Sequence, residues 1–179
     1  MKAYNLLPYT AVDGIPTFAD SFVRGLFERM RDEDLVDRVF YDGAVTTPEA
    51  FLQMMKQGMN RMFVIDLDGQ VAGLCWLNNF GARRAEFHFC FFYNLRGQDA
   101  VDVGKQVVTE LLYMEDGAGN PIFDVLFGMT EVDNKPARAW CENMGFEYMG
   151  VIPSFLYNAG LQKSVPSDFW YVERGHYGR

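Results

Sequence analysis

The sequence has few cysteines, no long apolar run and no concentration of basic residues. Its three cysteines, Cys75, Cys90 and Cys141, form no close pair, so they predict neither a disulfide framework nor a zinc ribbon. This usage favours a reducing compartment. No apolar stretch approaches the length of a membrane-spanning helix, and the first four residues, Met1-Lys2-Ala3-Tyr4, contain no apolar signal core. We therefore expect a cytoplasmic protein with no membrane partner.

Basic residues are outnumbered by acidic ones. Sixteen Lys and Arg stand against 24 Asp and Glu, which gives a formal net charge of −8. Nucleic-acid binding needs a basic face that displaces counterions, and the sequence has no Lys/Arg cluster of that kind. The negative charge favours a cationic small molecule or a basic peptide as partner. Solubility alone would explain the charge equally well.

Hydrophobic residues are plentiful by contrast. They make up 49% of the 179 residues, and the 16 Phe indicate a large aromatic core. A chain of this length suits one domain, and it contains no internal repeat or linker. We therefore expect residues 1–179 to form a single domain.

The first half of the chain combines helices with antiparallel strands. Patterning predicts a strand over 4–9, a helix over 18–30, a polar connection over 31–45 and a helix that begins at Thr47-Pro48. Strands over 62–67 and 70–77 flank Asp68-Gly69, a pair suited to a type I′ hairpin turn. A third strand over 84–93 alternates strictly. Its first face carries Glu86, His88, Cys90 and Phe92, and its second carries Phe87, Phe89, Phe91 and Tyr93.

The second half alternates helices and strands. It predicts a helix over 99–113 in which Gly104 allows close packing, a strand over 123–129, and a helix over 135–144 that ends at Gly145. Two final strands, over 146–152 and 168–173, are separated by a long polar loop. Hairpins followed by a β–α–β–α–β run predict an α/β fold, with a mixed and mostly antiparallel sheet and helices on both faces.

This order of elements, from Tyr4 to Glu173, resembles the GCN5-related N-acetyltransferase (GNAT) superfamily. The segment from Asn134 through Ala137 to Gly145-Phe146 is similar to the family's Asn-x-x-Ala … Gly-Phe motif. An ordinary capped amphipathic helix is the alternative interpretation of that segment. The resemblance implies the GNAT acyl-CoA N-acyltransferase fold, with acetyl-CoA as co-substrate.

A loop precedes the helix over 99–113 at the place where the family holds the cofactor's diphosphate. Arg96, Gly97 and Ala100 fit the family pattern, but Asp99 and Val101 depart from it. Asp99 at the start of a helix would compete with a bound anion. Such departures are similar to those of a divergent, phage-associated branch. The resemblance implies cofactor contacts at Phe91, Phe92, Tyr93, Arg96, Gly97, Gln98, Ala100 and Asn134.

Transfer of an acetyl group to an amine needs a base, because neutralising a lysine-like amine near pH 7 costs about 4 to 5 kcal/mol. Candidate bases are His88 and Glu86 on one face of the central strand, with Glu131 as a third. Each has a structural alternative as a hydrogen-bonded or solvated side chain. Cys141 occupies the position at which many family members carry a tyrosine that protonates the leaving thiolate. With so few candidate ligands, we expect no metal site.

The function implied is acetyl-CoA-dependent N-acetylation of a primary amine by direct attack. A catalytically impaired binding or scaffold module is the alternative, and transfer to a protein N-terminus or side chain is a third possibility. The resemblance implies that the acidic segment 31–45 and the late loop 153–166 border the acceptor pocket. The aromatic final strands are compatible with a homodimer or with a role in the core.

Overall fold

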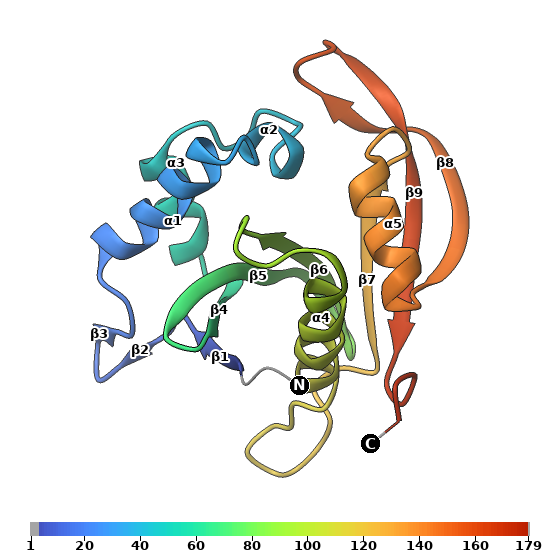
Figure 1. Ribbon diagram of the computed structural model, residues 1–179. Helices are drawn as coiled ribbons and strands as arrows, with labels where there is room; N and C mark the ends of the chain where they lie inside the picture. The colour runs from blue at the N-terminus through green and yellow to red at the C-terminus, as the bar shows by residue number, and fades with distance from the viewer. Residues whose placement is uncertain (1–3, 179) are drawn as a thin grey trace.

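The computed structural model describes residues 4–178, so the prediction made for Met1-Lys2-Ala3 lies outside the described residues. One seven-stranded sheet organises the chain, in the order β1-β4-β5-β6-β7-β9-β8 (Figure 1). A two-residue hairpin, β2 (Ala11–Val12) and β3 (Ile15–Pro16), lies outside it. The strands of the sheet are β1 (Tyr4–Pro8), β4 (Arg61–Leu67), β5 (Gln70–Gly81), β6 (Arg84–Phe91), β7 (Val125–Glu131), β8 (Glu147–Asn158) and β9 (Lys163–Glu173).

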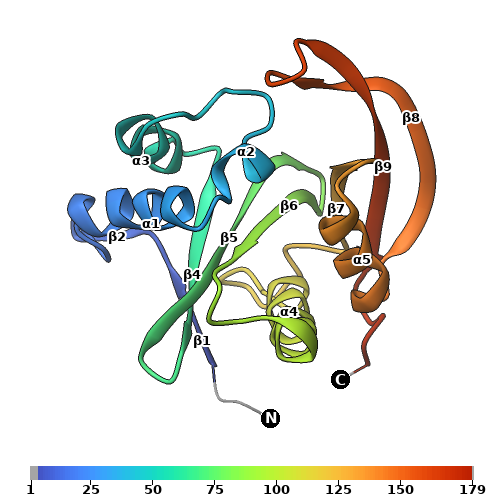
Figure 2. The ribbon, with the colours of Figure 1, turned by 45° about the horizontal axis from the view of Figure 1, so that its top comes forward.

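Helices cover both faces of this sheet, as Figure 2 shows. One face carries α1 (Asp20–Asp32), α2 (Val36–Val39) and α3 (Pro48–Lys56), and the other carries α4 (Gly97–Leu112) and α5 (Lys135–Met144). Each face has its own apolar core. The predicted mixed sheet with helices on both faces is therefore confirmed. No helix within residues 4–178 is long and apolar enough to span a membrane.

Local signals in the sequence set several element ends as expected. The Thr47 hydroxyl accepts a hydrogen bond from the Ala50 N–H at 3.1 Å and caps α3. Asp68 and Gly69 both have positive φ, 54° and 80°, which is the conformation of a type I′ turn. Gly145 ends α5 with a φ of 77°.

The two helices of the second face pack closely because Gly104 of α4 has no side chain. A Cβ atom there would lie 2.8 Å from both the Met144 sulfur and the Trp140 ring. Trp140 in turn stacks on Phe89 of β6, with ring centroids 3.6 Å apart. The predicted close approach at Gly104 is confirmed, and it holds α5 against the centre of the sheet.

Strands β6 and β7 pair in parallel only at their beginnings. Their register joins Arg84–Glu86 to Val125–Phe127, after which β7 continues beside β9 alone. A Cβ atom at Gly128 would lie 3.2 Å from the Phe87 carbonyl oxygen, so the separation begins just after this close approach. The strands then diverge, and within residues 4–178 the rest of β6 pairs only with β5.

Two predictions for the irregular segments are wrong. The expected polar loop over 153–166 is mostly strand, because β8 and β9 extend into a long hairpin across a register shift between Ile152 and Leu156. The expected polar connection over 31–45 contains the short helix α2 and buries Leu35, Phe40 and Val45. In both segments apolar residues are interspersed with polar ones, so neither segment shows a regular hydrophobic period.

Candidate active site

A cleft of about 660 Å³ lies where β6 and β7 separate. Its walls come from β6, the end of β7, the first turns of α4 and α5, and the segment around α2. The predicted site residues that line it are His88, Phe91, Arg96, Gly97, Gln98, Ala100, Glu131 and Asn134. Glu86, Phe92, Tyr93 and Cys141 lie outside its lining.

The backbone of β6 presents hydrogen-bond donors to this cleft. Phe92 N–H donates to the Ala72 carbonyl on β5 at 2.9 Å. Because backbone groups alternate in direction along a strand, the N–H groups of Phe89 and Phe91 point the other way, toward the gap beside β7. Tyr93 N–H donates to Glu33 Oε2 at 2.5 Å. Of the three predicted backbone contacts, the Phe91 amide therefore faces the cleft, whereas the N–H groups of Phe92 and Tyr93 are already engaged.

The N-terminus of α4 forms one end of the cleft. Arg96 precedes the helix with its guanidinium 4.3 Å from the centre of the Tyr93 ring. Gly97 adopts a φ of 61°, and no atom would lie within 4 Å of an added Cβ there, so the backbone is open to a ligand. Asp99 lies in the exposed first turn, outside the cleft lining. Positive helix-end potential and one arginine therefore face this end.

Asn134 lies opposite, at the start of α5. Its side-chain oxygen accepts a hydrogen bond from the Ala137 N–H at 3.3 Å, so it caps the helix. The same residue lines the cleft together with Pro136 and Ala137. The capping role and the cleft position, which were alternatives in the sequence, therefore occur together.

His88 lies on the far side of the sheet from α4, in an aromatic setting. Its ring stacks on Trp76 with centroids 4.7 Å apart, and Nε2 lies 3.0 Å from Asn78 Oδ1. An oxygen acceptor at that position requires the proton on Nε2, which leaves Nδ1 with a lone pair. The side chain is 30% exposed, and desolvation lowers its pKa from 6.5 to about 4. His88 is therefore neutral at pH 7 and able to accept a proton.

Two carboxylates flank this end of the cleft. Glu86 lies beside His88, with Oε1 3.7 Å from His88 Nε2, and desolvation raises its pKa while a hydrogen bond from Asn79 opposes the rise. Glu131 lines the cleft from the end of β7, and its Oε1 accepts a hydrogen bond from Asn158 Nδ2 at 2.7 Å. The pKa of the Tyr41 hydroxyl is raised, mainly by desolvation and also by the negative charges of nearby carboxylates, which include Glu86 and Glu131. This end is therefore aromatic and acidic.

Cys141 lies in the core rather than on the cleft. The residue is 3% exposed, and desolvation first, then the charge of Asp168, raises the pKa of its thiol to about 12. The thiol is not part of the lining of the cleft between β6 and β7. Helical spacing placed Cys141 on the buried face of α5, and that packing role is what the structure shows.

Sequence reasoning missed several cleft residues. Trp76 and Asn78 come from β5, Tyr41 follows α2, and Trp140 projects from α5. Trp76 and Trp140 carried only the ordinary signal of core aromatics. Asn78 and Tyr41 reach the cleft through contacts between segments distant in sequence, for which one sequence holds no pattern.

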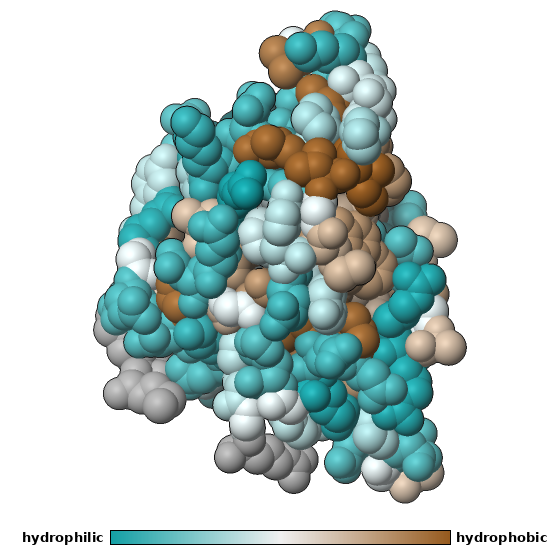
Figure 3. Space-filling model, turned by 90° about the vertical axis from the view of Figure 1, so that its right-hand side faces the viewer, coloured by the Kyte–Doolittle hydropathy of each residue, from teal (hydrophilic) through white to brown (hydrophobic). Residues whose placement is uncertain are grey.

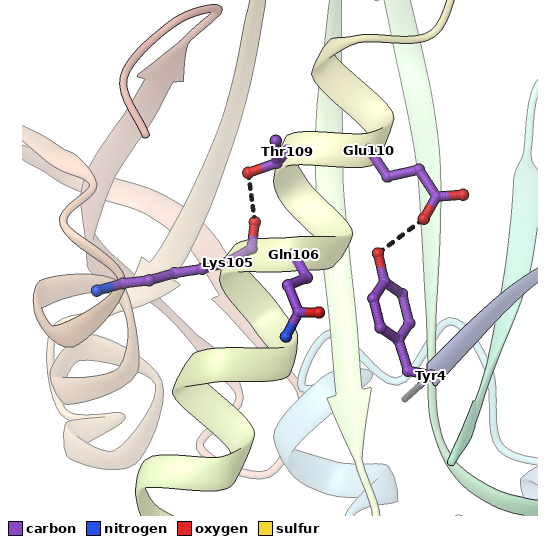
Figure 4. Close-up of a pocket in the computed structure, with 5 residues that line it drawn as sticks. All are labelled: Tyr4, Lys105, Gln106, Thr109 and Glu110. Atoms are coloured by element: carbon purple, nitrogen blue, oxygen red, sulfur yellow. Dashed lines mark hydrogen bonds between the residues drawn. The ribbon is translucent and has the colours of Figure 1, made fainter. Parts of the chain in front are cut away.

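A shallower hollow of about 340 Å³ lies between β1 and the outer side of α4 (Figure 4). There Tyr4 donates its hydroxyl hydrogen to Glu110 Oε2 at 2.7 Å, and Thr109 donates to the Lys105 carbonyl at 2.7 Å. The first bond ties the edge strand β1 to α4 and the second lies within α4, so both have a structural role. Among residues 4–178, no group of three or more His, Cys, Asp or Glu is placed to hold a metal ion.

No protein-family model and no curated protein sequence matches the chain. Solved structures do match it along most of its length. A probable acetyltransferase of the GNAT family from Chromobacterium violaceum has a TM-score of 0.74 at 14% identity, over 99% of this chain and 86% of the other. An acetyltransferase from Salmonella typhimurium that modifies the N-terminal serine of ribosomal protein L7/L12 has a TM-score of 0.70 at 14% identity, over 87% and 91%.

A third similar structure is spermidine N-acetyltransferase from Vibrio cholerae in complex with CoA and spermine. Its TM-score is 0.67 at 15% identity, over 97% of each chain. At these identities the likeness is one of fold. The chain therefore has the GNAT fold, as the resemblance in its sequence implied.

Proposed function

We propose that this chain, as one domain, is an acetyl-CoA-dependent N-acetyltransferase that transfers the acetyl group to a primary amine by direct attack. The observation that carries the proposal is the separation of β6 from β7, which turns the amides of Phe89 and Phe91 toward a cleft. These donors adjoin the N-terminus of α4. Unpaired amides beside a helix N-terminus suit a ligand that carries both a carbonyl group and a diphosphate.

The residues present fit acetyl-CoA at both of its polar ends. The Phe91 amide would bind the pantetheine arm or the thioester oxygen, while Arg96, Gly97, Gln98 and Ala100 would surround the diphosphate. Asn134 would contact the arm from α5. Gly97 leaves room for a close approach of the phosphate oxygens, and exposed Asp99 lies outside the lining.

The amine would approach from the His88 side of the sheet. Its nitrogen attacks the thioester carbonyl carbon, the C–N bond forms, the C–S bond breaks, and the thiolate leaves. His88 Nδ1 or a water molecule accepts the proton that the nitrogen loses, and Trp76 and Asn78 hold the imidazole. The cationic amine first loses one proton to solvent water, because a base with a pKa of about 4 is too weak to deprotonate an ammonium group. His88 suffices for the second proton, because the attacking nitrogen becomes strongly acidic once it is bonded to the carbonyl carbon.

The acceptor class proposed is a cationic amine. Two carboxylates, those of Asp42 and Glu131, line the acceptor end together with one basic side chain, Arg38. Two of the similar structures act on amines, spermidine in one and a protein N-terminus in the other. Comparing acetylation of polyamines and lysyl peptides with that of neutral amines tests this point. Equal or faster rates on neutral amines would remove it.

Cofactor binding is the first experiment, because acetyl-CoA that binds only the native state raises the melting temperature. A ligand at 100 times its Kd adds about 2.7 kcal/mol of stability. Release of free thiol from acetyl-CoA with a panel of amines then measures turnover. An unchanged melting temperature at millimolar acetyl-CoA would overturn the proposal.

A second candidate is a GNAT-fold module that binds acyl-CoA but turns it over slowly. The buried position of Cys141 favours it, because the residue at the expected leaving-group position is not on the cleft. A thermal shift with acetyl-CoA but no thiol release on any amine would support this reading. Without an acid to protonate the leaving thiolate, the activation free energy rises by about 2 kcal/mol, so the reaction is slower but still possible.

Assembly remains a prediction. β8 is the outer strand of the sheet, and Figure 3 shows hydrophobic side chains gathered on this side of the molecule, below the tip of the β8–β9 hairpin. Met149, Val151 and Phe155 are exposed there. A homodimer would cover them, and sedimentation of the purified protein decides between dimer and monomer.

A further inference from the structure

Aromatic contacts join the acceptor end of the cleft, around His88, to the face of the sheet that carries α1, α2 and α3. Phe40, directly after α2, stacks on Trp76 with ring centroids 5.7 Å apart. Trp76 stacks in turn on His88. These contacts fix the segment after α2 against β5 and β6, so they form one side of the opening through which an acceptor would reach His88.

The tip of the β8–β9 hairpin is bonded to two residues that line the cleft, Tyr41 and Glu131. Ala159 N–H donates to the Tyr41 carbonyl at 2.8 Å, and Asn158 Nδ2 donates to Glu131 Oε1 at 2.7 Å. The approach is close, since a Cβ atom at Gly43 would lie 2.9 Å from the Ala159 Cβ. Figures 1 and 2 show the hairpin tip reaching toward the segment after α2.

Together with the pairing of β6 and β7 at their beginnings, these contacts complete a circuit, which we call the acceptor ring: Phe40–Tyr41, Ala159, Asn158, Glu131 and the Trp76–His88 stack. The ring is joined by hydrogen bonds and packed aromatics rather than by a long mobile loop. Its chemistry is that of a site for a cation, because it presents aromatic side chains and the Glu131 carboxylate.

We propose that the acceptor ring restricts the acceptor to a slender, free aliphatic amine and excludes amines carried on a folded protein. The inference rests on the proposed acetyl transfer and adds a size limit to it. A free amine presents one extended chain, which passes through the ring. A lysine side chain or terminus on a folded surface carries bulk on both sides, which meets the hairpin tip and the Tyr41 segment before its nitrogen reaches His88.

The first test opens the ring. Ala159→Pro removes the N–H that bonds to Tyr41, and Asn158→Ala, as a second variant, removes the bond to Glu131. Gly160→Ala is the matched control, because its added Cβ would make only an ordinary 3.4 Å contact with Asn158. The readout is kcat/KM for a free aliphatic diamine relative to the same amine on a lysyl segment fused to a folded carrier protein.

The unaltered chain is expected to prefer the free diamine by about 100-fold, and each opening variant to reduce that preference by up to about tenfold, the worth of one hydrogen bond. Gly160→Ala keeps the original preference. Comparable rates on the free and the carrier-borne amine in the unaltered chain would overturn the inference. So would opening variants that fold but leave the preference unchanged.

A second measurement tests the size limit of the ring by thiol labelling, without any acetyl transfer. Asn78→Cys places a thiol inside the ring, and its labelling by a small cationic methanethiosulfonate is compared with labelling by a maleimide on a folded carrier. The parent chain, whose three cysteines are buried, gives the background. Small-reagent labelling at least about 100-fold faster, with the difference reduced by Ala159→Pro, supports the ring.

Labelling of the introduced thiol by both reagents at similar rates would overturn the inference. The two proposals are therefore separable. Selective labelling with no acetylation of any amine means that the proposed transfer fails while the size limit holds. Acetylation of free and protein-borne amines alike means that the proposed transfer holds while the size limit fails.

Discussion

Glu33, the C-cap residue of α1, accepts a hydrogen bond from the backbone N–H of Tyr93 at 2.5 Å, across 60 residues of sequence. Its second carboxylate oxygen pairs with Arg29 at 2.9 Å. Arg29 also donates to the Val71 carbonyl and to Asn94 Oδ1. The first helix thereby holds the loop that leads from β6 into α4, the loop to which we assign the cofactor's diphosphate.

We expect Glu33→Ala to raise the KM for acetyl-CoA by about three- to tenfold, because the loop loses a charge-assisted hydrogen bond. The kcat should change by less than about twofold, since the β6 amides and His88 stay in place. Glu33→Gln should restore part of the KM, because its amide oxygen can accept the Tyr93 N–H. Glu28→Ala, exposed on the same helix, is the control. A uniform loss of kcat with unchanged KM would contradict this role.

His88 should make the folded protein less stable in acid. Its pKa is lowered to about 4 from 6.5, so folding favours the neutral ring. The stability linked to this preference is fully present above pH 6.5 and is lost as the pH falls toward 4, because the unfolded chain then binds the proton and the folded chain does not. Urea unfolding of His88→Asn should show a pH dependence smaller by about 1–3 kcal/mol over that range.

The Glu86 carboxyl faces His88 and acts in the opposite direction. Its raised pKa means that the folded state gains stability as the pH falls through that value, so Glu86→Gln must be measured alongside. If wild type and His88→Asn keep parallel stability curves from pH 7 to pH 4, the ring is not held neutral by the fold.

Gly97→Ala should weaken acetyl-CoA binding about five- to tenfold and lower stability by about 1 kcal/mol, because residue 97 adopts a positive φ that alanine disfavours. Thermal shift titrations measure both effects. Gly117→Ala is the matched control, because it also meets open space but needs no positive φ. Equal affinities for the two variants would show that the left-handed backbone at 97 does not shape the binding site.

The three cysteines should be unreactive in the native state. All are buried, and desolvation raises the pKa of Cys90 and of Cys141 to about 12 and that of Cys75 further still. Since the thiolate is the reactive form, Ellman's reagent at pH 8 should titrate no thiol rapidly in folded protein and all three in guanidinium. Rapid reaction of one thiol in the native protein would place that cysteine on an accessible surface.

The elements that form the α4 end of the cleft could be predicted from the sequence, because adjacent residues specify each of them. Strict alternation along β6 assigned His88 and Phe91 to opposite faces, and helix-end signals placed Asn134 at the start of α5. Gly97 was expected in the loop before a helix over 99–113, and the structure begins α4 at this residue. Such patterns depend on neighbours within one turn or one strand. The GNAT fold followed from the same local order of elements.

The acceptor end could not be predicted in the same way, because its contacts join distant segments. The polar connection predicted over 31–45 places Phe40 against Trp76, and its Tyr41 carbonyl accepts a hydrogen bond from the Ala159 N–H. A hydrogen bond between two backbone groups leaves no matching residue type in the sequence. The extended β8–β9 hairpin was hidden by Pro153 and by Ser154, which has a φ of 53°.

The late position of β8 and β9 in the chain has a consequence for synthesis on the ribosome. All of β4 through α5, which flank the β6 amides, precede residue 145, whereas the wall that carries Asn158 and Ala159 is made last. Until residues 146–173 have emerged, β7 lacks its partner β9, and a nascent chain has an exposed strand edge at that point.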